Sequence, residues 1–255
     1  MNPDQQFDDQ NLSRVEAMLL DHEVARGYFQ GELYDRNNNR LKSITLDCQD
    51  GNVHYLSETT VGRLFMIPDH SAVWALMRNE HADAPAGLEI QSISPLLPEG
   101  TTNSVIAFRD KTGQAIWVNA LHIHRFMLSN NVAKRLATVS FGLMTITAYR
   151  LGFERISLFA AGKGPLKPED ADALIGFSVW PKFGFDAPIS AAEMNRTPLA
   201  ALRNARTVQE VLAVSPQWWA RHGTGRIMDF DLTTRSRSWS ILLNYLYEVL
   251  QEKRS

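Results

Sequence analysis

The fold is decided by residues 114–185, which read QAIWVNALHIHRFMLSNNVAKRLATVSFGLMTITAYRLGFERISLFAAGKGPLKPEDADALIGFSVWPKFGF. Residues 114–128 predict one long strand that is bent or contains a bulge. Residues 130–151 carry apolar side chains at steps of three and four, which predicts a helix. Gly152 supplies the C-terminal cap of that helix, and 155–160 predicts a buried strand. A helix that starts directly after a strand offers free N–H groups and a positive dipole end, so this order predicts an anion site.

Further strands are predicted before this segment, at 88–94 and 104–109, with the turn Asp110–Gly113 after them. The order predicts an α/β fold with a mixed, largely antiparallel sheet and flanking helices. Three regions follow from it: an N-terminal helix and strand extension (1–84), a core (85–189) and a helical C-terminal elaboration (190–255).

The N-terminal region gives weaker patterns. Residues 1–10 are polar and predict disorder. Residues 11–26 predict a helix with a capping box formed by Ser13 and Glu16. Residues 61–67 predict a strand and 71–77 a short helix or turn.

Composition excludes several classes of protein. The 26 basic and 28 acidic residues give a net charge of −2, which argues against nucleic-acid binding by bulk charge. The one cysteine, Cys48, cannot form an intrachain disulfide. The chain has no apolar run long enough for a membrane span, and its start does not resemble a secretory signal. We therefore expect a cytoplasmic protein, with export by a signal-independent secretion system left open.

The turn LSNNVAKRL, residues 128–136, precedes the long helix. Over about residues 85–189 the layout resembles the core of the GNAT acetyltransferase superfamily, in which this helix N-terminus holds the pyrophosphate of acetyl-CoA. With Leu136 at the family's Leu position, Ala133 matches the small residue, Asn131 replaces the usual Gly, and Leu128 replaces Gln or Arg. The resemblance implies that acetyl-CoA is held by Asn131, Val132, Ala133, Lys134 and Arg135. The alternative is an ordinary helix start capped by Ser129 or Asn130.

The end of the same unit also bears on this resemblance. Gly184-Phe185 matches the family's Gly-Phe, and Trp180 stands where the family has a Tyr that acts as general acid. The indole N–H of a tryptophan cannot donate a proton in the useful range. The alternative role of these aromatic residues is core packing, which would involve Phe177, Trp180, Phe183 and Phe185.

His122 and His124 are two residues apart on a predicted strand, so their side chains share a face. Two imidazoles can bind a metal or act as a general base, but no third ligand has a convincing spacing and no metal site is expected. In an acetyltransferase, either histidine could take the proton of the amine substrate. The alternative is a pair of half-buried, hydrogen-bonded side chains.

The segment 218–226 reads WWARHGTGR and is predicted to be a loop that touches a ligand. Its glycines let a backbone approach closely, and Arg221 and Arg226 could bind a carboxylate or phosphate of the substrate beside a catalytic His222. We expect this loop to share a cleft with His122 and His124. The alternative is a connecting loop anchored by its tryptophans.

The leading functional hypothesis is acetyl transfer from acetyl-CoA to an amine, carried by a small molecule or a protein. One alternative is a divergent GNAT-fold effector or toxin with other chemistry centred on residues 218–226. Another is a non-enzymatic interaction module.

Overall fold

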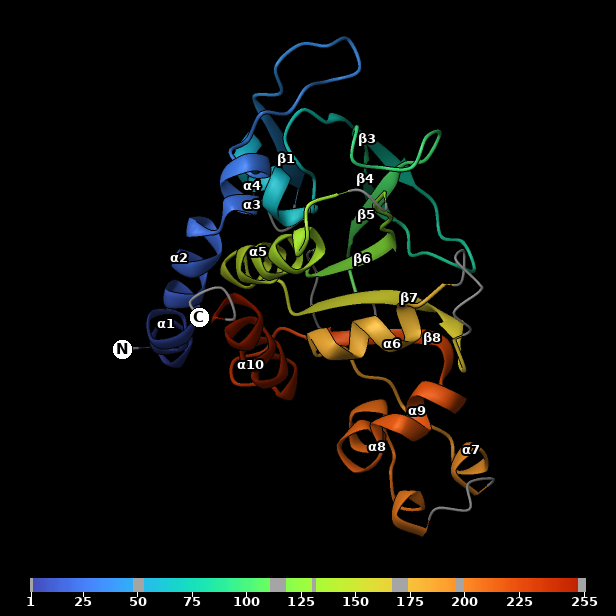
Figure 1. Ribbon diagram of the computed structural model, residues 1–255. Coiled ribbons are helices and arrows are strands. Elements are labelled where there is room, and N and C mark those ends of the chain that lie inside the picture. Colours follow the sequence, from blue (N-terminus) through green and yellow to red (C-terminus); the bar gives the residue numbers. More distant parts are fainter. Residues whose placement is uncertain are drawn as a thin grey trace. The chain divides into compact units, whose positions relative to one another are not determined.

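The computed structural model describes residues 2–47, 53–110, 118–129, 132–166, 174–195 and 200–251 (Figure 1). It has two compact units. Unit 1 comprises Met1–Ile156, Leu232–Thr234 and Leu246–Ser255, and unit 2 comprises Ser157–Asp231 and Arg235–Tyr245. The fold class is confirmed, because the chain is a mixed α/β protein whose sheet is largely antiparallel and flanked by helices.

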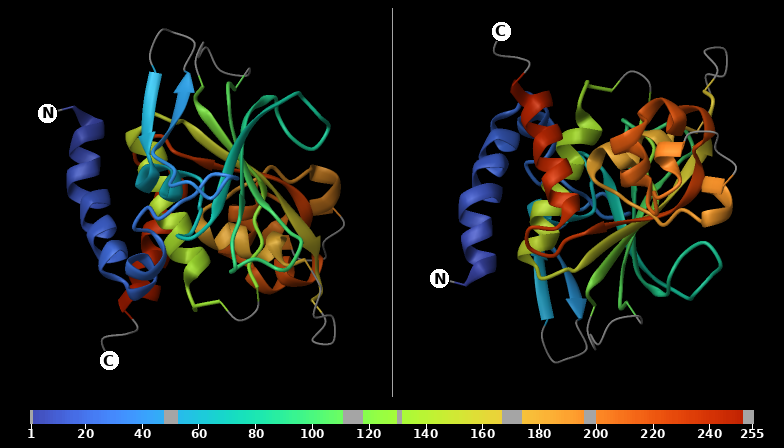
Figure 2. Two further views of the ribbon diagram at one scale, coloured as in Figure 1. Left: turned by 90° about the horizontal axis from the view of Figure 1, so that it is seen from above. Right: turned by 90° about the horizontal axis from the view of Figure 1, so that it is seen from below.

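Unit 1 holds the antiparallel strands and most of the long helices. Its helical elements are α1 (Pro3–Phe7), the π-helical η1 (Asp8–Leu12), α2 (Ser13–Asp21), α3 (Glu23–Tyr28), α4 (Glu58–Leu64) and α5 (Leu136–Arg150). Its strands are β1 (Ser43–Asp47), β2 (Val53–Ser57), β3 (Ala72–Arg78), β4 (Gly87–Ile93), β5 (Asn103–Phe108) and β6 (Ala120–Arg125). Strands β3, β4, β5 and β6 pair antiparallel in that order, and β1 pairs with β2 as a separate ribbon that leads into α4 (Figure 2).

Helix α5 lies between the N-terminal helices and strands β3–β6, as Figures 1 and 2 both show. It packs against α2, α3 and α4. The predicted apolar stripe is buried, with relative exposures of 2% or less for Leu136, Val139, Leu143 and Ile146. Gly142 lets another helix approach, because a Cβ atom there would stand 2.9 Å from Cδ1 of Leu19.

The predicted disorder of residues 1–10 is wrong for the part that the structure describes. From Pro3 the chain is helical: Asn2 caps α1 by accepting a hydrogen bond from the N–H of Asp4, and Phe7 is buried with its ring 5.6 Å from that of Tyr149. The capping box is also wrong. Ser13 continues a helical run, and Glu16 instead binds Arg150 at 2.6 Å.

For two short segments the predicted type of secondary structure is wrong. Residues 61–67, predicted as a strand, contain most of α4, whose first turn is capped by the hydroxyl of Ser57. Residues 71–77, predicted as a helix or turn, form β3, in which Trp74 pairs with Gln91. The predicted helix start at Asn130 is wrong as well: α5 begins at Leu136, after Arg135 in a left-handed conformation with φ 72°.

Unit 2 contains the remaining strands and a group of short helices. The elements are β7 (Arg155–Lys163), α6 (Gly176–Val179), the 3₁₀ helix η2 (Trp180–Phe183), α7 (Ala191–Asn195), the 3₁₀ helix η3 (Ala200–Leu202), α8 (Val208–Val214), α9 (Pro216–His222), β8 (Thr224–Asp231) and α10 (Arg237–Gln251). The first two residues of β7 and the end of α10 belong to unit 1. Strands β7 and β8 are neighbours, and α6 packs on β8.

The core of unit 2 is aromatic. Phe177, Phe185, Phe230 and Trp239 are each 1% exposed or less. The ring of Phe230 lies 5.8 Å from Phe185 and 5.4 Å from Trp239, both edge-on. The aromatic residues of this segment therefore pack in the core, which was the alternative to a role in catalysis. Edge-on contacts suit the charge distribution of aromatic rings.

The packing of α5 can be tested by truncation. Leu143→Ala should lower the free energy of unfolding by roughly 2–5 kcal/mol, because it leaves a cavity beside a fully buried side chain. Thr147→Ala, on the same helix at a partly exposed position, is the control and should cost much less. Equal losses for the two variants in urea denaturation would contradict the packing described.

Candidate functional site

A polar network crosses one face of strands β3–β6. In the register of the sheet, Glu89 of β4 stands opposite Ile106 of β5, which stands opposite His122 of β6. Arg78 of β3, Ser104 of β5, His124 of β6 and Asp83 of the β3–β4 connection join the same network. The network therefore gathers carboxylates, a guanidinium and two imidazoles in one part of unit 1.

Glu89 is the centre of this network and is only 4% exposed. One carboxylate oxygen accepts hydrogen bonds from Ser104 Oγ at 2.5 Å and Gln91 Nε2 at 3.0 Å, and the other accepts one from Arg78 at 3.1 Å. Burial alone would raise the pKa of Glu89, but these three donors outweigh it and hold the pKa below its ordinary value. Glu89 is therefore a stable carboxylate at neutral pH.

The two histidines lie together, with ring centroids 6.2 Å apart. Burial, and then the charge of His124, lower the pKa of His122 to about 4. Burial, and then the charge of Arg78, lower the pKa of His124, while Asp83 and Glu89 act in the opposite direction. Both rings are therefore neutral at pH 7, and each can accept a proton.

His124 differs from His122 in access and in backbone geometry. Ser104 pairs with Arg125 and Val105 with Ile123, so His124 is the extra residue of a β-bulge. Bulges of this kind turn a side chain to a new direction and are common beside active sites. The Nε2 atom of His124 lies 3.9 Å from Oδ2 of Asp83, an exposed carboxylate that would stabilise a protonated ring. His122 by contrast is 6% exposed and hydrogen-bonded to the backbone of Asp83.

The start of α5 is the second part of the candidate site. Arg135 is the N-cap residue without a side-chain cap, and the first turn contains no acidic residue. The N–H of Leu136 donates to Ala133 O, and the N–H of Val132 donates to Ser129 O. Lys134 is exposed, and Arg135, Val132 and Ala133 are partly buried. Of the predicted cofactor residues, Asn131 lies outside the described residues, and so does the Asn130 proposed as a cap.

The segment 218–226 is not the loop that was predicted. Its first half lies in α9, which Ser215 caps and Pro216 opens, and Thr224–Arg226 begins β8. Trp219 is 3% exposed, and its Nε1 donates to Phe177 O at 2.9 Å. The tryptophan therefore anchors the helix, as the structural alternative proposed.

The polar residues of that segment have different surroundings. Arg226 forms an ion pair with Glu193 at 2.7 Å, donates to Pro188 O and lies over the Trp219 ring. His222 is exposed, with its ring 5.1 Å from that of Trp218, and Arg221 is exposed. These residues lie in unit 2 and the histidines of β6 in unit 1, so the shared cleft stays a prediction.

Trp180, which was compared with the general acid of GNAT proteins, packs in unit 2. Its ring lies 5.3 Å from Phe185 and 5.8 Å from Phe183. Packing explains its presence without any role in proton transfer.

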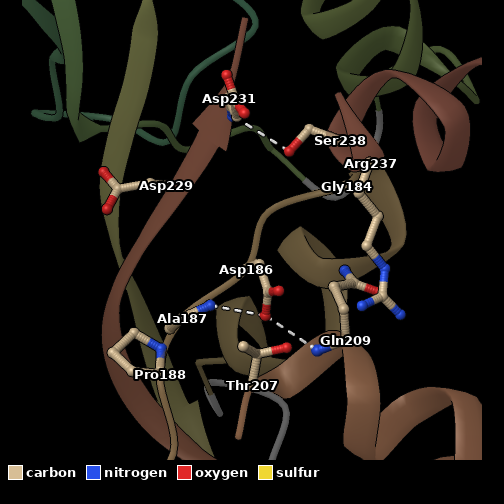
Figure 3. Close-up of a pocket in the computed structure, with 10 residues that line it drawn as sticks. All are labelled: Gly184, Asp186, Ala187, Pro188, Thr207, Gln209, Asp229, Asp231, Arg237 and Ser238. Atoms are coloured by element: carbon tan, nitrogen blue, oxygen red, sulfur yellow. Dashed lines mark hydrogen bonds between the residues drawn. The ribbon is translucent and has the colours of Figure 1, made fainter. Parts of the chain in front are cut away.

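Unit 2 also has a cavity of about 340 Å³, shown in Figure 3. Its lining is formed by Gly184, Asp186, Ala187, Pro188, Thr207, Gln209, Asp229, Asp231, Arg237 and Ser238. One oxygen of Asp186 accepts from the N–H groups of Ala187 and Gln209, and Ser238 Oγ accepts from the N–H of Asp231. Asp186 thus joins the segment after η2 to the start of α8, which is a structural role.

Sequence reasoning missed Glu89, Arg78, Ser104 and Asp83. A glutamate and a glutamine at alternate positions of the apolar run 88–94 were the available signal. Within the described residues, no group of three or more His, Cys, Asp or Glu side chains is placed to bind a metal ion. No helix in that part of the chain combines the length and apolar character needed to cross a membrane.

The low pKa of His122 predicts how stability depends on pH. Between about pH 6.5 and pH 4 the unfolded chain binds a proton at this residue that the folded chain does not, so acidification favours unfolding. The total effect of this residue on the free energy of unfolding is about 3 kcal/mol. His122→Gln should flatten the fall in unfolding free energy across this range, and the exposed His81→Gln should leave it unchanged. An unaltered slope in His122→Gln, measured by urea denaturation at several pH values, would contradict the assignment.

Comparison of the chain with protein-family models, with curated proteins and with solved structures gives no match. Function is therefore inferred from the residues of the sheet face and of the start of α5.

Proposed function

We propose that this protein is an N-acyltransferase that transfers an acetyl group from acetyl-CoA to an amine. The observation that carries the proposal is the pair of neutral histidines on β6, the strand that precedes α5, whose N-cap residue Arg135 makes no side-chain cap. A proton acceptor and a candidate anion site thus both belong to unit 1, on elements that follow each other along the chain. The layout that resembles the GNAT core supports the same reaction.

The start of α5 fits a phosphate group in charge. Its first turn has N–H groups that helix geometry leaves without intrahelical acceptors, and its dipole favours an anion. Lys134 and Arg135 add positive charge, and no acidic residue of the first turn opposes it. These residues would hold the pyrophosphate of acetyl-CoA, which supplies the activated acetyl thioester.

His124 is the residue that we assign as general base. In this reaction the amine nitrogen forms a bond to the acetyl carbonyl carbon, and the bond from that carbon to sulfur breaks. The nitrogen must lose a proton in the process. His124 is neutral, has greater access than His122, and would accept that proton at Nε2 with Asp83 beside it. The thiolate that leaves would take its proton from water, since Trp180 cannot supply one.

Coenzyme A binding is the first test. Coenzyme A should raise the melting temperature, because a ligand that binds only the folded state stabilises it. The Lys134→Glu, Arg135→Glu double variant should weaken binding by about tenfold or more, since hydrogen bonds to charged groups contribute roughly 1.5–3 kcal/mol each. Lys42→Glu, at an exposed position elsewhere in unit 1, is the control. No thermal shift and no heat of binding with the wild-type protein would reject the proposal and favour an interaction module.

The role of His124 predicts a separate kinetic result. His124→Gln should reduce kcat by roughly 10²–10⁴-fold, the usual contribution of a general base, and leave coenzyme A binding unchanged. In the wild type, the fall in kcat that reports protonation of His124 should lie below pH 6.5, since burial lowers the pKa of His124 and the base is lost when it is protonated. Release of free thiol from acetyl-CoA with a panel of amines measures both. Full activity in His124→Gln would overturn this assignment, while coenzyme A binding would still stand.

A further inference from the structure

Strand β3 forms an edge of the antiparallel sheet, since it pairs with β4 and is last in the strand order. On its other side the described residues provide one short contact at the beginning of the strand. The N–H of Tyr34 donates to Ser71 O, and the N–H of Val73 donates to Tyr34 O. From Trp74 to Arg78, no described strand covers this edge.

The contact with Tyr34 reveals which backbone groups point outward. The N–H and C=O of one strand residue point to the same side, and the side alternates along the strand. Because Ser71 and Val73 point away from β4, so do Ala75 and Met77. These two residues present donors and acceptors along the open edge.

Along most of its length this edge lacks the usual protection against strand pairing, and its one charged residue, Arg78, ends the strand and is paired with Glu89 and Asp83. Natural edges are protected by lysines, prolines or inward charges. The run Ala72–Met77 reads AVWALM and has no charged residue or proline. Leu76 is 41% exposed and Met77 is 81% exposed.

We propose that β3 is a self-association edge that pairs antiparallel with β3 of a second copy, about a two-fold axis at Leu76. In this register Ala75 faces Met77 of the other copy, and Met77 faces its Ala75. Both are hydrogen-bonded pairs, each exchanging two N–H···O bonds. The small Ala75 leaves room for the long Met77, and Leu76 meets Leu76 across the axis.

The neighbouring register is excluded by the contact with Tyr34. An axis at Ala75 would require the N–H of Val73 as a donor, and this group already donates to Tyr34 O at 2.8 Å. The axis at Leu76 uses only residues beyond that contact.

The charges at the ends of the pairing also favour a second copy as the occupant. With the axis at Leu76, each Arg78 stands opposite Trp74 of the other copy and away from the other Arg78. The two Arg78 side chains therefore do not face each other, which would be destabilising for like charges. The paired segment is short, so we expect the dimer to depend on protein concentration.

Sedimentation velocity across a concentration series tests this proposal. The wild type should shift with concentration from a monomer of 28.8 kDa towards twice that mass. Ala75→Pro removes an outward N–H that β4 does not use, and Met77→Lys introduces a charge, so each should abolish the dimer. Tyr55→Lys, which replaces a side chain exposed to 77% on β2, is the matched control and should still dimerise. Circular dichroism shows whether each variant is folded. If Ala75→Pro does not fold, Met77→Lys alone decides the result.

Crosslinking tests the register itself. In a Cys48→Ser background, Leu76→Cys should form an interchain disulfide under mild oxidation, because Cβ atoms of directly opposite residues are about 4.5–5.5 Å apart. Met77→Cys should crosslink far less, since its partner is Ala75. A wild type that stays monomeric at every concentration would overturn the proposal. So would a dimer that survives both Ala75→Pro and Met77→Lys, and efficient crosslinking through Met77→Cys alone would overturn the register.

Discussion

The burial of α5 on nearly all sides is the constraint on which unit 1 depends. N-terminal helices cover one side of the helix and strands β3–β6 lie on the other (Figure 1). Gly142 faces α2 at close range, and a Cβ atom there would stand 2.9 Å from Cδ1 of Leu19. A helix held in this way cannot shift along its axis without opening both interfaces. Its N-terminus is therefore fixed at Leu136, and this gives the candidate anion site a defined place in unit 1.

The buried carboxylate of Glu89 sets the chemistry of the sheet face. A buried charge is tolerated only when it is paired and hydrogen-bonded, and Ser104, Gln91 and Arg78 meet that requirement. Arg78 is largely committed to this structural task. The groups of this network that remain available for proton transfer are His124, which is neutral, and Asp83 beside it. A neutral base with an adjacent carboxylate suits removal of a proton from an amine, which connects this network to the proposed acetyl transfer.

The sequence predicts elements with long, regular patterns better than short ones. The stripe of α5 and strands β4 and β5 are found where periodicity placed them. Short apolar runs do not distinguish a helix from a strand, and for this reason α4 and β3 were exchanged. The α1 segment depends on a tertiary contact of Phe7 with Tyr149, which its polar composition does not reveal. The histidine pair is visible in sequence, but its partner Glu89 becomes apparent only when the sheet register is known.

A crystal structure of the protein with coenzyme A tests the central claim most directly. The account predicts the pyrophosphate within hydrogen-bonding distance of the first turn of α5 and of Lys134 or Arg135, with the thiol directed towards His124. Coenzyme A bound away from the start of α5, or a thiol directed away from the β6 histidines, would contradict the account.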